Sequence, residues 1–199
     1  MEKQLNTNYK KKIIVGISGA SGAILGIQLL EIMKEHPEWE THLVMSKGAE
    51  FTIAHETVYT FKQVKSLADK VYNIENIGDS IASGSFQTEG MIIIPCSMKT
   101  VAGIACGYSD NLLLRAADVT LKERRKLVIV ARESPMSTIH LRNMLTLAEA
   151  GAYIMPPVAT YYHKPLSLEE MNLNIIGKIL DKFGIEVTGY QRWGEDSKR

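Results

Sequence analysis

The sequence predicts a single α/β domain with an open, doubly wound parallel sheet and helices on both of its faces. Two apolar runs, 92–94 and 127–130, do not alternate with polar residues, which is typical of strands that are covered on both faces. Stretches rich in Leu, Ala, Lys and Glu separate these runs from other apolar runs, and a repeated strand, helix, strand order favours a parallel sheet. A chain of 199 residues with 45% hydrophobic residues is sufficient for one packed domain.

The expected elements follow the chain in a regular alternation. The strands are the apolar runs 13–17, 43–45, 91–94, 127–130 and 153–155. The helices are the stretches 23–35, 47–57, 61–72, 98–106, 112–125, 139–150 and 168–183. The last helix has the clearest signal, because Ser167 and Glu170 have the spacing of a capping box and an apolar stripe follows them. We expect this stripe to pack against the sheet or against another subunit.

The charge balance and the short apolar segments exclude several classes of protein. Lys and Arg number 23 against 22 Asp and Glu, so a net charge of +1 gives no general attraction to nucleic acid or to an anionic membrane. Apolar stretches stay well below the roughly 20 residues of a membrane span. Lys10, Lys11 and Lys12 lead into a strand rather than a signal peptide. We expect a cytoplasmic protein with polar tails at 1–10 and 196–199 flanking a domain at 11–195.

Cysteine and histidine spacing gives no indication of a metal site. Cys96 and Cys106 are ten positions apart, which matches no zinc or redox motif, so reduced thiols are expected. The five histidines likewise lack the spacing of metal ligands. The sequence therefore predicts chemistry without a metal ion.

Glycine, proline and polar residues collect where the expected strands end. The segments are 16–22, 46–47, 95–100, 132–135 and 156–165. Ligands of open parallel sheets bind beyond the carboxyl ends of the strands. We therefore expect these five segments to converge on one crevice.

Two of these segments suit a phosphate group at a helix start. In the first, glycines allow backbone N–H groups to approach an anion and Ser21 is placed to cap the helix. In the other, Ser97 and Thr100 supply hydroxyls, although an ordinary turn and an ordinary N-cap explain the same residues without a ligand. Ser18 replaces the second glycine of GxGxxG, and Ser46-Lys47 stands where an acid would bind ribose, so a mononucleotide fits better than a dinucleotide.

Charged residues elsewhere leave two interpretations open. Arg115 and Lys122 are seven residues apart and share a helix face with apolar residues, so they need either Asp118 as a common partner or an anionic ligand. Glu56 and Glu133 are candidate catalytic acids. A lone helix carboxylate such as Glu56 is more often a solvated surface residue, and Glu133 beside Arg132 is also consistent with a loop ion pair.

Seven segments together resemble the UbiX family of flavin prenyltransferases. They are GASGA (19–23), HET (55–57), ASGS (82–85), PCSMKT (95–100), NLLLRAADVTLKERRKLVIVARESP (111–135), YYHKP (161–165) and RWGE (192–195). The resemblance extends over nearly all of residues 11–195, and its longest segment, 111–135, is the most specific.

The resemblance implies a flavodoxin-like, Rossmann-like fold and an enzyme that needs no metal. Such an enzyme transfers the dimethylallyl group of dimethylallyl phosphate to N5 and C6 of reduced FMN. The prenylated FMN then serves a separate UbiD-type decarboxylase. Family members are homo-oligomers, typically dodecamers, with the flavin close to subunit boundaries.

The family motifs also imply roles for particular residues. Those implied to bind FMN are Gly19, Ala20, Ser21, Ser46, Ser97, Met98, Lys99, Thr100 and Arg132. Those implied to surround the prenyl phosphate are Ser83, Arg115, Lys122, Tyr162 and Lys178. Ser21 and Glu56 correspond to groups near flavin N5, Lys122 to a group that stabilises the leaving phosphate, and Glu133 to the acid beside it.

The chain departs from its relatives at two positions. Lys178 stands where many relatives have Arg, and Lys keeps the charge but loses the bidentate geometry. Ile77 stands where some relatives have an aromatic ring, so the flavin or another aromatic such as Trp193 would have to stabilise a cation. Two other functions remain open: an FMN-dependent decarboxylase acting directly on an aromatic acid, and a non-catalytic flavin carrier.

Overall fold

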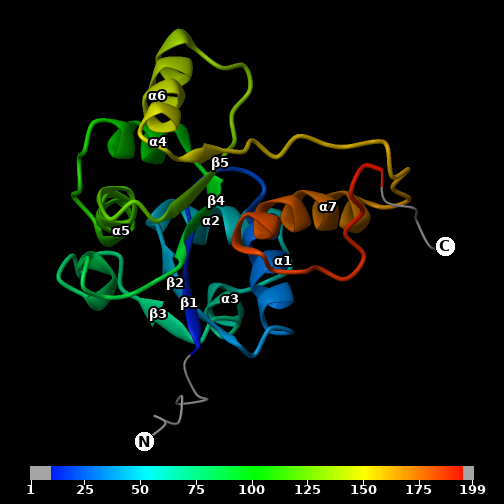
Figure 1. Cartoon of the computed structure of the whole chain (residues 1–199), viewed down its shortest axis with the longest axis horizontal. Helices are drawn as coiled ribbons and strands as arrows, with labels where there is room; N and C mark the ends of the chain where they lie inside the picture. Colours follow the sequence, from blue (N-terminus) through cyan, green and yellow to red (C-terminus); the bar gives the residue numbers. More distant parts are fainter. Residues whose placement is uncertain (1–9, 195–199) are drawn as a thin grey trace, which may run out of the picture.

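Six parallel strands form one sheet in the computed structural model, which describes residues 10–194 (Figure 1). The order is β3-β2-β1-β4-β5-β6, so the chain first builds outward on one side of β1 and then on the other. The strands are β1 (Lys11–Ile17), β2 (Trp39–Met45), β3 (Lys70–Tyr72), β4 (Gly90–Cys96), β5 (Lys126–Ala131) and β6 (Tyr153–Ile154). This is the doubly wound sheet that the sequence predicts.

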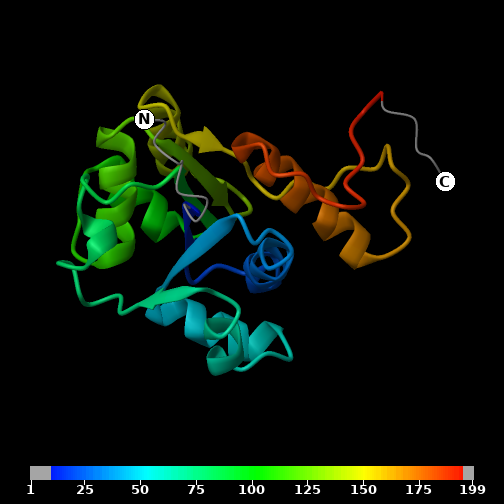
Figure 2. The same cartoon turned by 60° about the horizontal axis from the view of Figure 1, so that its bottom comes forward.

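Helices cover both faces of this sheet (Figure 2). The α-helices are α1 (Ala23–Met33), α2 (Lys47–Glu56), α3 (Phe61–Lys65), α4 (Met98–Ala105), α5 (Leu112–Lys122), α6 (Thr138–Glu149) and α7 (Leu168–Leu180). Two 3₁₀ turns are η1 (Ser80–Ala82) and η2 (Asp181–Phe183). Side chains of β4 alternate between two cores, with Ile92 and Ile94 facing α1, α2, α3 and α7 and Met91 and Ile93 facing α4, α5 and α6.

The five predicted strands are confirmed, but two expectations about helices are wrong. The expected helix 61–72 ends at Lys65, and residues 70–72 form the short edge strand β3 instead. Three residues are too few to show alternation, so the only sequence signals for this strand were β-branched Val71 and aromatic Tyr72.

The expected capping box of α7 is only half formed. Ser167 Oγ accepts from Glu170 N at 3.2 Å, whereas the Glu170 carboxylate accepts from Leu166 N instead of from the N-cap. Helix α7 ends at Leu180, and η2 continues to Phe183.

Strand direction gives the sheet two edges that matter for function. We call the end after the strands the carboxyl edge and the end before them the amino edge. The loops after β1, β2, β4 and β5 lie at the carboxyl edge. By contrast, the segment 156–165 after β6 runs away from the sheet and lies beside α7 (Figures 1 and 2).

Some sequence predictions fall outside the described part of the chain. The expected tails 1–10 and 196–199 lie outside it except for Lys10, and so does Glu195 at the end of the expected domain. Within residues 10–194, no helix is both long and apolar enough to cross a membrane.

Candidate functional site

Hydrogen bonds join the loops that follow β1, β4 and β5 at the carboxyl edge. Ser18, which is buried, donates its hydroxyl to the carbonyl of Pro95 at 3.1 Å and accepts from the backbone N–H of Ser97 at 2.7 Å. The N–H of Arg132 donates to the carbonyl of Cys96 at 3.0 Å. Ser97 and Arg132 are therefore brought to one edge, as expected from the pattern of strands.

The loops after β1 and β2 meet through two glycines. A Cβ on Gly19 would lie 2.8 Å from Gly48 Cα, so neither position has room for a side chain without a backbone shift. Three residues after Gly19, at the end of the loop after β1, the N–H of Gly22 donates to Glu56 Oε2 at the end of α2, at 2.8 Å. Ser21 and Glu56 are thus adjacent, and Glu56 is not simply a solvated helix residue.

The expected capping role of Ser21 is wrong. The N-cap of α1 is Gly22, which has φ 96° and no side-chain capping bond. Glycine adopts this left-handed conformation at little cost, so the chain enters α1 without needing a side-chain cap. The Ser21 hydroxyl is consequently not engaged in capping the helix beside it.

Two serines at this edge do cap helices. Ser46 Oγ accepts from Ala49 N at 3.2 Å at the start of α2, and Ser97 Oγ accepts from Thr100 N at 3.4 Å at the start of α4. The Ser97 and Thr100 hydroxyls are also 3.1 Å apart. The ordinary N-cap interpretation of Ser97 is therefore confirmed, although a helix start with free N–H groups is also favourable for an anion.

A cavity of about 400 Å³ lies against these helix starts. Its lining combines residues from both sides of β1: Gly19, Ser46, Lys47, Gly48, Ile74, Glu75, Ser97, Lys99, Thr100, Asp110, Asn111, Leu113 and Leu114. Lys47 Nζ lies 2.8 Å from Glu75 Oε1, and this hydrogen bond raises the pKa of Lys47. Hydroxyls, helix N-termini and lysines beside apolar Ile74 and Leu114 fit a phosphate attached to a largely apolar ring system.

A second group of predicted residues lies at the amino edge. The turn 83–86, here called the serine turn, leads into β4 and is closed by a bond from Phe86 N to the Ser83 carbonyl at 3.2 Å. Lys122 ends α5 immediately before β5 and forms an ion pair with Glu123. A Cβ on Gly84 would lie 2.9 Å from Lys122 Nζ, so Lys122 contacts the serine turn.

The structure separates the two cations of α5. Arg115 Nη1 lies 2.7 Å from Asp118 Oδ2, while Lys122 pairs with Glu123 rather than with Asp118. The expectation that Asp118 satisfies both cations is therefore wrong for Lys122. The side chains of Arg115 and Lys122 remain 38% and 46% exposed, which leaves both accessible to an anion.

A third group lies beside α7. The Tyr162 hydroxyl donates to the Gln191 carbonyl at 3.0 Å, and its ring meets Trp193 edge to face at 5.4 Å. Lys178, one turn after Asn174 on α7, lines a cavity of about 580 Å³ between α7 and β6. Tyr162 and Lys178 therefore belong to one neighbourhood, which is separate from the serine turn.

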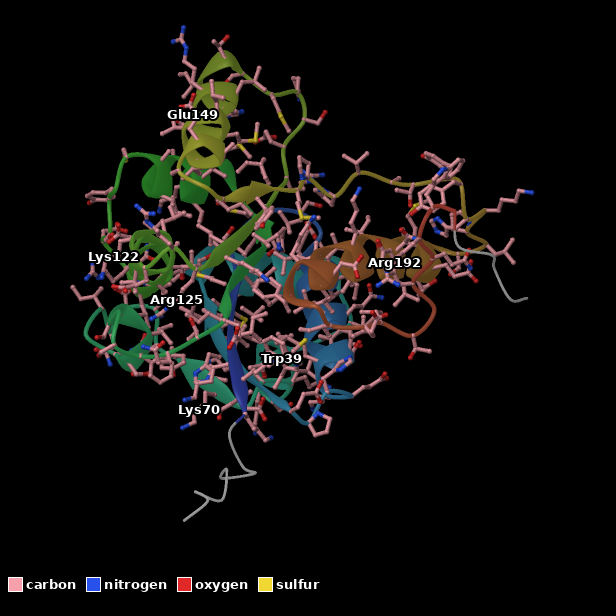
Figure 3. All side chains as sticks on the ribbon, in the orientation of Figure 1. Trp39, Lys70, Lys122, Arg125, Glu149 and Arg192 are labelled. Atoms are coloured by element: carbon pink, nitrogen blue, oxygen red, sulfur yellow. The ribbon has the colours of Figure 1, made fainter. Side chains whose placement is uncertain are left out.

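One copy of the chain does not bring all predicted site residues together. In Figure 3, Lys122 and Arg192 mark opposite flanks of the molecule, and Arg192 follows the Gln191 carbonyl that binds Tyr162. The expectation of five segments converging on one crevice is wrong for segment 156–165. Lys122 and Ser21 also lie apart, because Lys122 precedes a strand whereas Ser21 follows one. In a parallel sheet these positions lie at opposite edges.

Comparison with known proteins places the chain in a family. A family model for flavoproteins matches residues 1–182. The probable UbiX-like flavin prenyltransferase of Sedimentibacter hydroxybenzoicus is 51% identical over 182 residues, which are 92% of this chain and 96% of that protein. The chain belongs to the UbiX-like flavin prenyltransferase family of flavoproteins.

Solved structures of UbiX-like proteins have the same fold. The crystal structure of AnUbiX (PadA1) in complex with FMN and dimethylallyl pyrophosphate has a TM-score of 0.91 at 48% identity and covers 94% of this chain and 100% of that one. A dodecameric FMN-dependent UbiX-like decarboxylase from Escherichia coli O157:H7 also has a TM-score of 0.91, at 50% identity, covering 92% of this chain and 100% of that one. The UbiX-like fold predicted from the sequence is thereby confirmed.

The two departures from the UbiX-like pattern have clear positions. Ile77 is 53% exposed, so its replacement of an aromatic residue does not disturb the core. Trp193, the aromatic named as an alternative, contacts Tyr162 and is 80% exposed in a single copy. Trp193 and Tyr162 therefore form an accessible aromatic surface beside α7.

Several residues of these sites escaped the sequence interpretation. Glu75 and Asn111 line the cavity at the carboxyl edge, and Arg125 contacts the serine turn. Asn111 precedes α5 and accepts from Leu114 N at 3.1 Å, so its capping position was a readable signal. The candidate acid Glu133 accepts from Ser134 N at 3.0 Å. Within residues 10–194, no three His, Cys, Asp or Glu side chains are arranged to hold a metal ion.

Proposed function

We propose that this protein is a flavin prenyltransferase, which joins the dimethylallyl group of dimethylallyl phosphate to N5 and C6 of reduced FMN. The observation that carries the proposal is the cavity at the carboxyl edge, where the close approach of Gly19 to Gly48 brings the loops after β1 and β2 together beside two helix starts. A relative with 51% sequence identity is named a probable UbiX-like flavin prenyltransferase, and a structural neighbour was crystallised with FMN and dimethylallyl pyrophosphate.

The carboxyl edge suits the FMN phosphate and ring. Backbone N–H groups at the starts of α1, α2 and α4 supply donors that need no charged side chain, and hydroxyls of Ser46, Ser97 and Thr100 surround them. We assign FMN binding to Gly19, Ala20, Ser21, Ser46, Ser97, Met98, Lys99, Thr100 and Arg132. When bound, reduced FMN supplies the nucleophilic ring positions, and the chain supplies position and charge.

The prenyl phosphate requires cations that act as its C–O bond breaks. Negative charge grows on the leaving phosphate, so groups such as Lys122 that bind it more strongly in the transition state lower the barrier. We assign this role to Ser83, Arg115, Lys122, Tyr162 and Lys178. Because one copy holds these residues in two separate regions, the complete site would combine residues of different copies in a homo-oligomer such as the dodecamer of the Escherichia coli relative.

Ring closure at C6 releases a proton, and the chain has a candidate route for it. Glu56 receives the Gly22 N–H on Oε2, which leaves its other oxygen available next to Ser21. A serine hydroxyl and a carboxylate in this order form a relay at the loop assigned to the flavin. Glu133, at the carboxyl end of β5, is the group we assign to protonation of the leaving phosphate.

The test is anaerobic incubation of the purified protein with reduced FMN and dimethylallyl phosphate, followed by mass spectrometry of the flavin. We expect a mass gain of one prenyl unit. Absence of that gain, with FMN bound, would refute the proposal. Release of carbon dioxide from an aromatic acid by this protein alone would instead support the decarboxylase that the structural neighbour from Escherichia coli O157:H7 is named for.

A flavin carrier is separated from a transferase by Glu133→Gln. This substitution removes an acid of the proposed chemistry without changing side-chain size, so a transferase should lose turnover by roughly 100-fold or more while FMN stays bound. A carrier would be unaffected. We also propose that the protein acts in the cytoplasm and that a UbiD-type decarboxylase uses its prenylated FMN.

A further inference from the structure

One guanidinium group donates to two backbone carbonyls of the serine turn. Arg125 Nη1 donates to the Phe86 carbonyl at 2.8 Å, and Nη2 donates to the Gly84 carbonyl at 2.6 Å. A guanidinium with two parallel donors is suited to bridge two carbonyls of one turn, whereas an ammonium is not. Arg125 is half-buried and lies just after α5. Its partners Phe86 and Gly84 precede it by 39 and 41 residues in the sequence.

The turn that Arg125 holds carries two hydroxyls, one on each side of Gly84. Ser83 Oγ and Ser85 Oγ are 2.8 Å apart, and Ser85 N donates to Ser83 Oγ at 3.3 Å. Both serines are exposed, while Lys122 and Glu123 lie against Gly84 between them. A hollow of about 540 Å³, which Lys122 and Arg125 help to line, opens beside this arrangement.

The opposite side of the turn rests on a buried support. The Phe86 ring meets His42 edge to face at 5.3 Å, and His42 is 1% exposed. This contact fixes the end of the turn that enters β4, but it does not reach Gly84. At Gly84, where glycine gives the chain its greatest freedom, the backbone carbonyl accepts from Arg125 Nη2.

We propose that Arg125 is a positioning residue for the prenyl donor, because its clamp on Gly84 and Phe86 holds Ser83 and Ser85 beside Lys122. This inference rests on the proposed function, in which Ser83 and Lys122 bind the prenyl phosphate. Two N–H donors of Arg125 bind backbone carbonyls of the serine turn, so Arg125 affects the prenyl phosphate through the position of this turn. Preformed donors lower the cost of ordering groups when the phosphate binds, so the effect falls on substrate affinity rather than on the chemical step.

The test compares Arg125→Lys with the wild-type protein loaded with FMN. Lysine keeps the positive charge but cannot bridge both carbonyls. We expect the KM for dimethylallyl phosphate to rise roughly tenfold, with kcat within about twofold and FMN affinity unchanged. Hydrogen exchange at residues 83–86 should accelerate in the variant. Arg142→Lys, the same change at an exposed position on α6, is the control and should alter neither quantity.

Two results would overturn the inference. One is an unchanged KM in Arg125→Lys when the wild type is active. The other is a parallel loss of kcat, FMN binding and melting temperature, which indicates a general structural role. If the wild type does not prenylate FMN, the proposed function fails separately. In that case the affinity for inorganic phosphate decides: weaker binding by Arg125→Lys supports the positioning role, and equal binding refutes it.

Discussion

Replacing Gly19 by alanine is a direct test of the proposed FMN site, because the perturbation is confined to one contact. The new Cβ would lie 2.8 Å from Gly48 Cα and 2.9 Å from Gly48 C, whereas ordinary contact begins at 3.4 Å, so the two backbones must separate by about 0.6 Å. Neither neighbour is a flexible side chain that can turn away. The separation moves the start of α2 away from the loop after β1.

The cost of this shift divides between stability and ligand affinity. Overpacking of this kind destabilises a protein by about 1–3 kcal/mol. Losing one hydrogen bond to a charged phosphate costs about 1.5–3 kcal/mol, which corresponds to roughly tenfold to 100-fold weaker FMN binding. The measurements are a flavin fluorescence titration for Kd and a thermal melt for stability, both on purified protein.

Gly78→Ala provides the matched control. A Cβ at Gly78 has Asn76 Oδ1 at 3.9 Å as its nearest neighbour, so the same chemical change has room there. We expect Gly78→Ala to bind FMN as the wild type does. A Gly19→Ala variant that remains folded and keeps the wild-type Kd would refute the argument that the Gly19 and Gly48 contact shapes the flavin site.

Two further predictions concern charges away from this contact. Glu123 forms an ion pair with Lys122, and the hydrogen bond from the Lys122 ammonium lowers the pKa of the Glu123 carboxyl. Because Glu123→Gln removes this competing negative charge, we expect steady-state assays at low salt to show a several-fold lower KM for dimethylallyl phosphate. An unchanged KM would contradict this expectation. Burial lowers the pKa of His42 below its ordinary value of 6.5, so the unfolded chain takes up the proton first and stability falls as pH drops below about 6.5. Denaturant unfolding between pH 7 and 5 should show a shallower pH dependence for His42→Asn, and equal slopes would show that His42 does not contribute.

The fold was predictable from the sequence because its central strands are apolar throughout. Residues 92–94 and 127–130 are buried on both faces of the sheet, so apolar and polar residues do not alternate in these runs. Such continuous apolar runs are typical of strands in a parallel sheet. The edge strand β3 was not predictable in the same way. It has three residues, two of them exposed, and its place in the sheet depends on pairing with β2 rather than on a local pattern.

The candidate site was only partly predictable, because a motif identifies residues but not their edge of the sheet. Ser46 and Ser97 follow strands and meet at the carboxyl edge, as expected. Lys122 precedes β5, so its position in the chain already indicated the amino edge. Arg125 had no sequence signal, because its partners are backbone carbonyls that lie 39 and 41 residues earlier in the chain. A side-chain motif does not indicate contacts with backbone carbonyls.

The separation of Lys122 from Ser21 and Glu56 within one copy leads to a prediction about assembly. If the proposed site takes Glu56 from one copy and Lys122 from another, Glu56→Gln and Lys122→Ala should each be inactive alone. Subunits of the two variants that assemble together at random should regain activity at about a quarter of the sites, because those sites receive both intact residues. The measurement is prenyl transfer by co-expressed, co-purified oligomers.

A second pair of variants tests whether activity returns only when the two intact residues come from different copies. Ser21 and the Gly22 N–H that binds Glu56 belong to the same loop, so Ser21→Ala and Glu56→Gln damage the same group of residues. Mixed oligomers of that pair should stay inactive, since no site receives both residues intact from one copy. Recovery by both pairs, or by neither, would show that the two edges of the sheet do not contribute to one site in the way that their positions require.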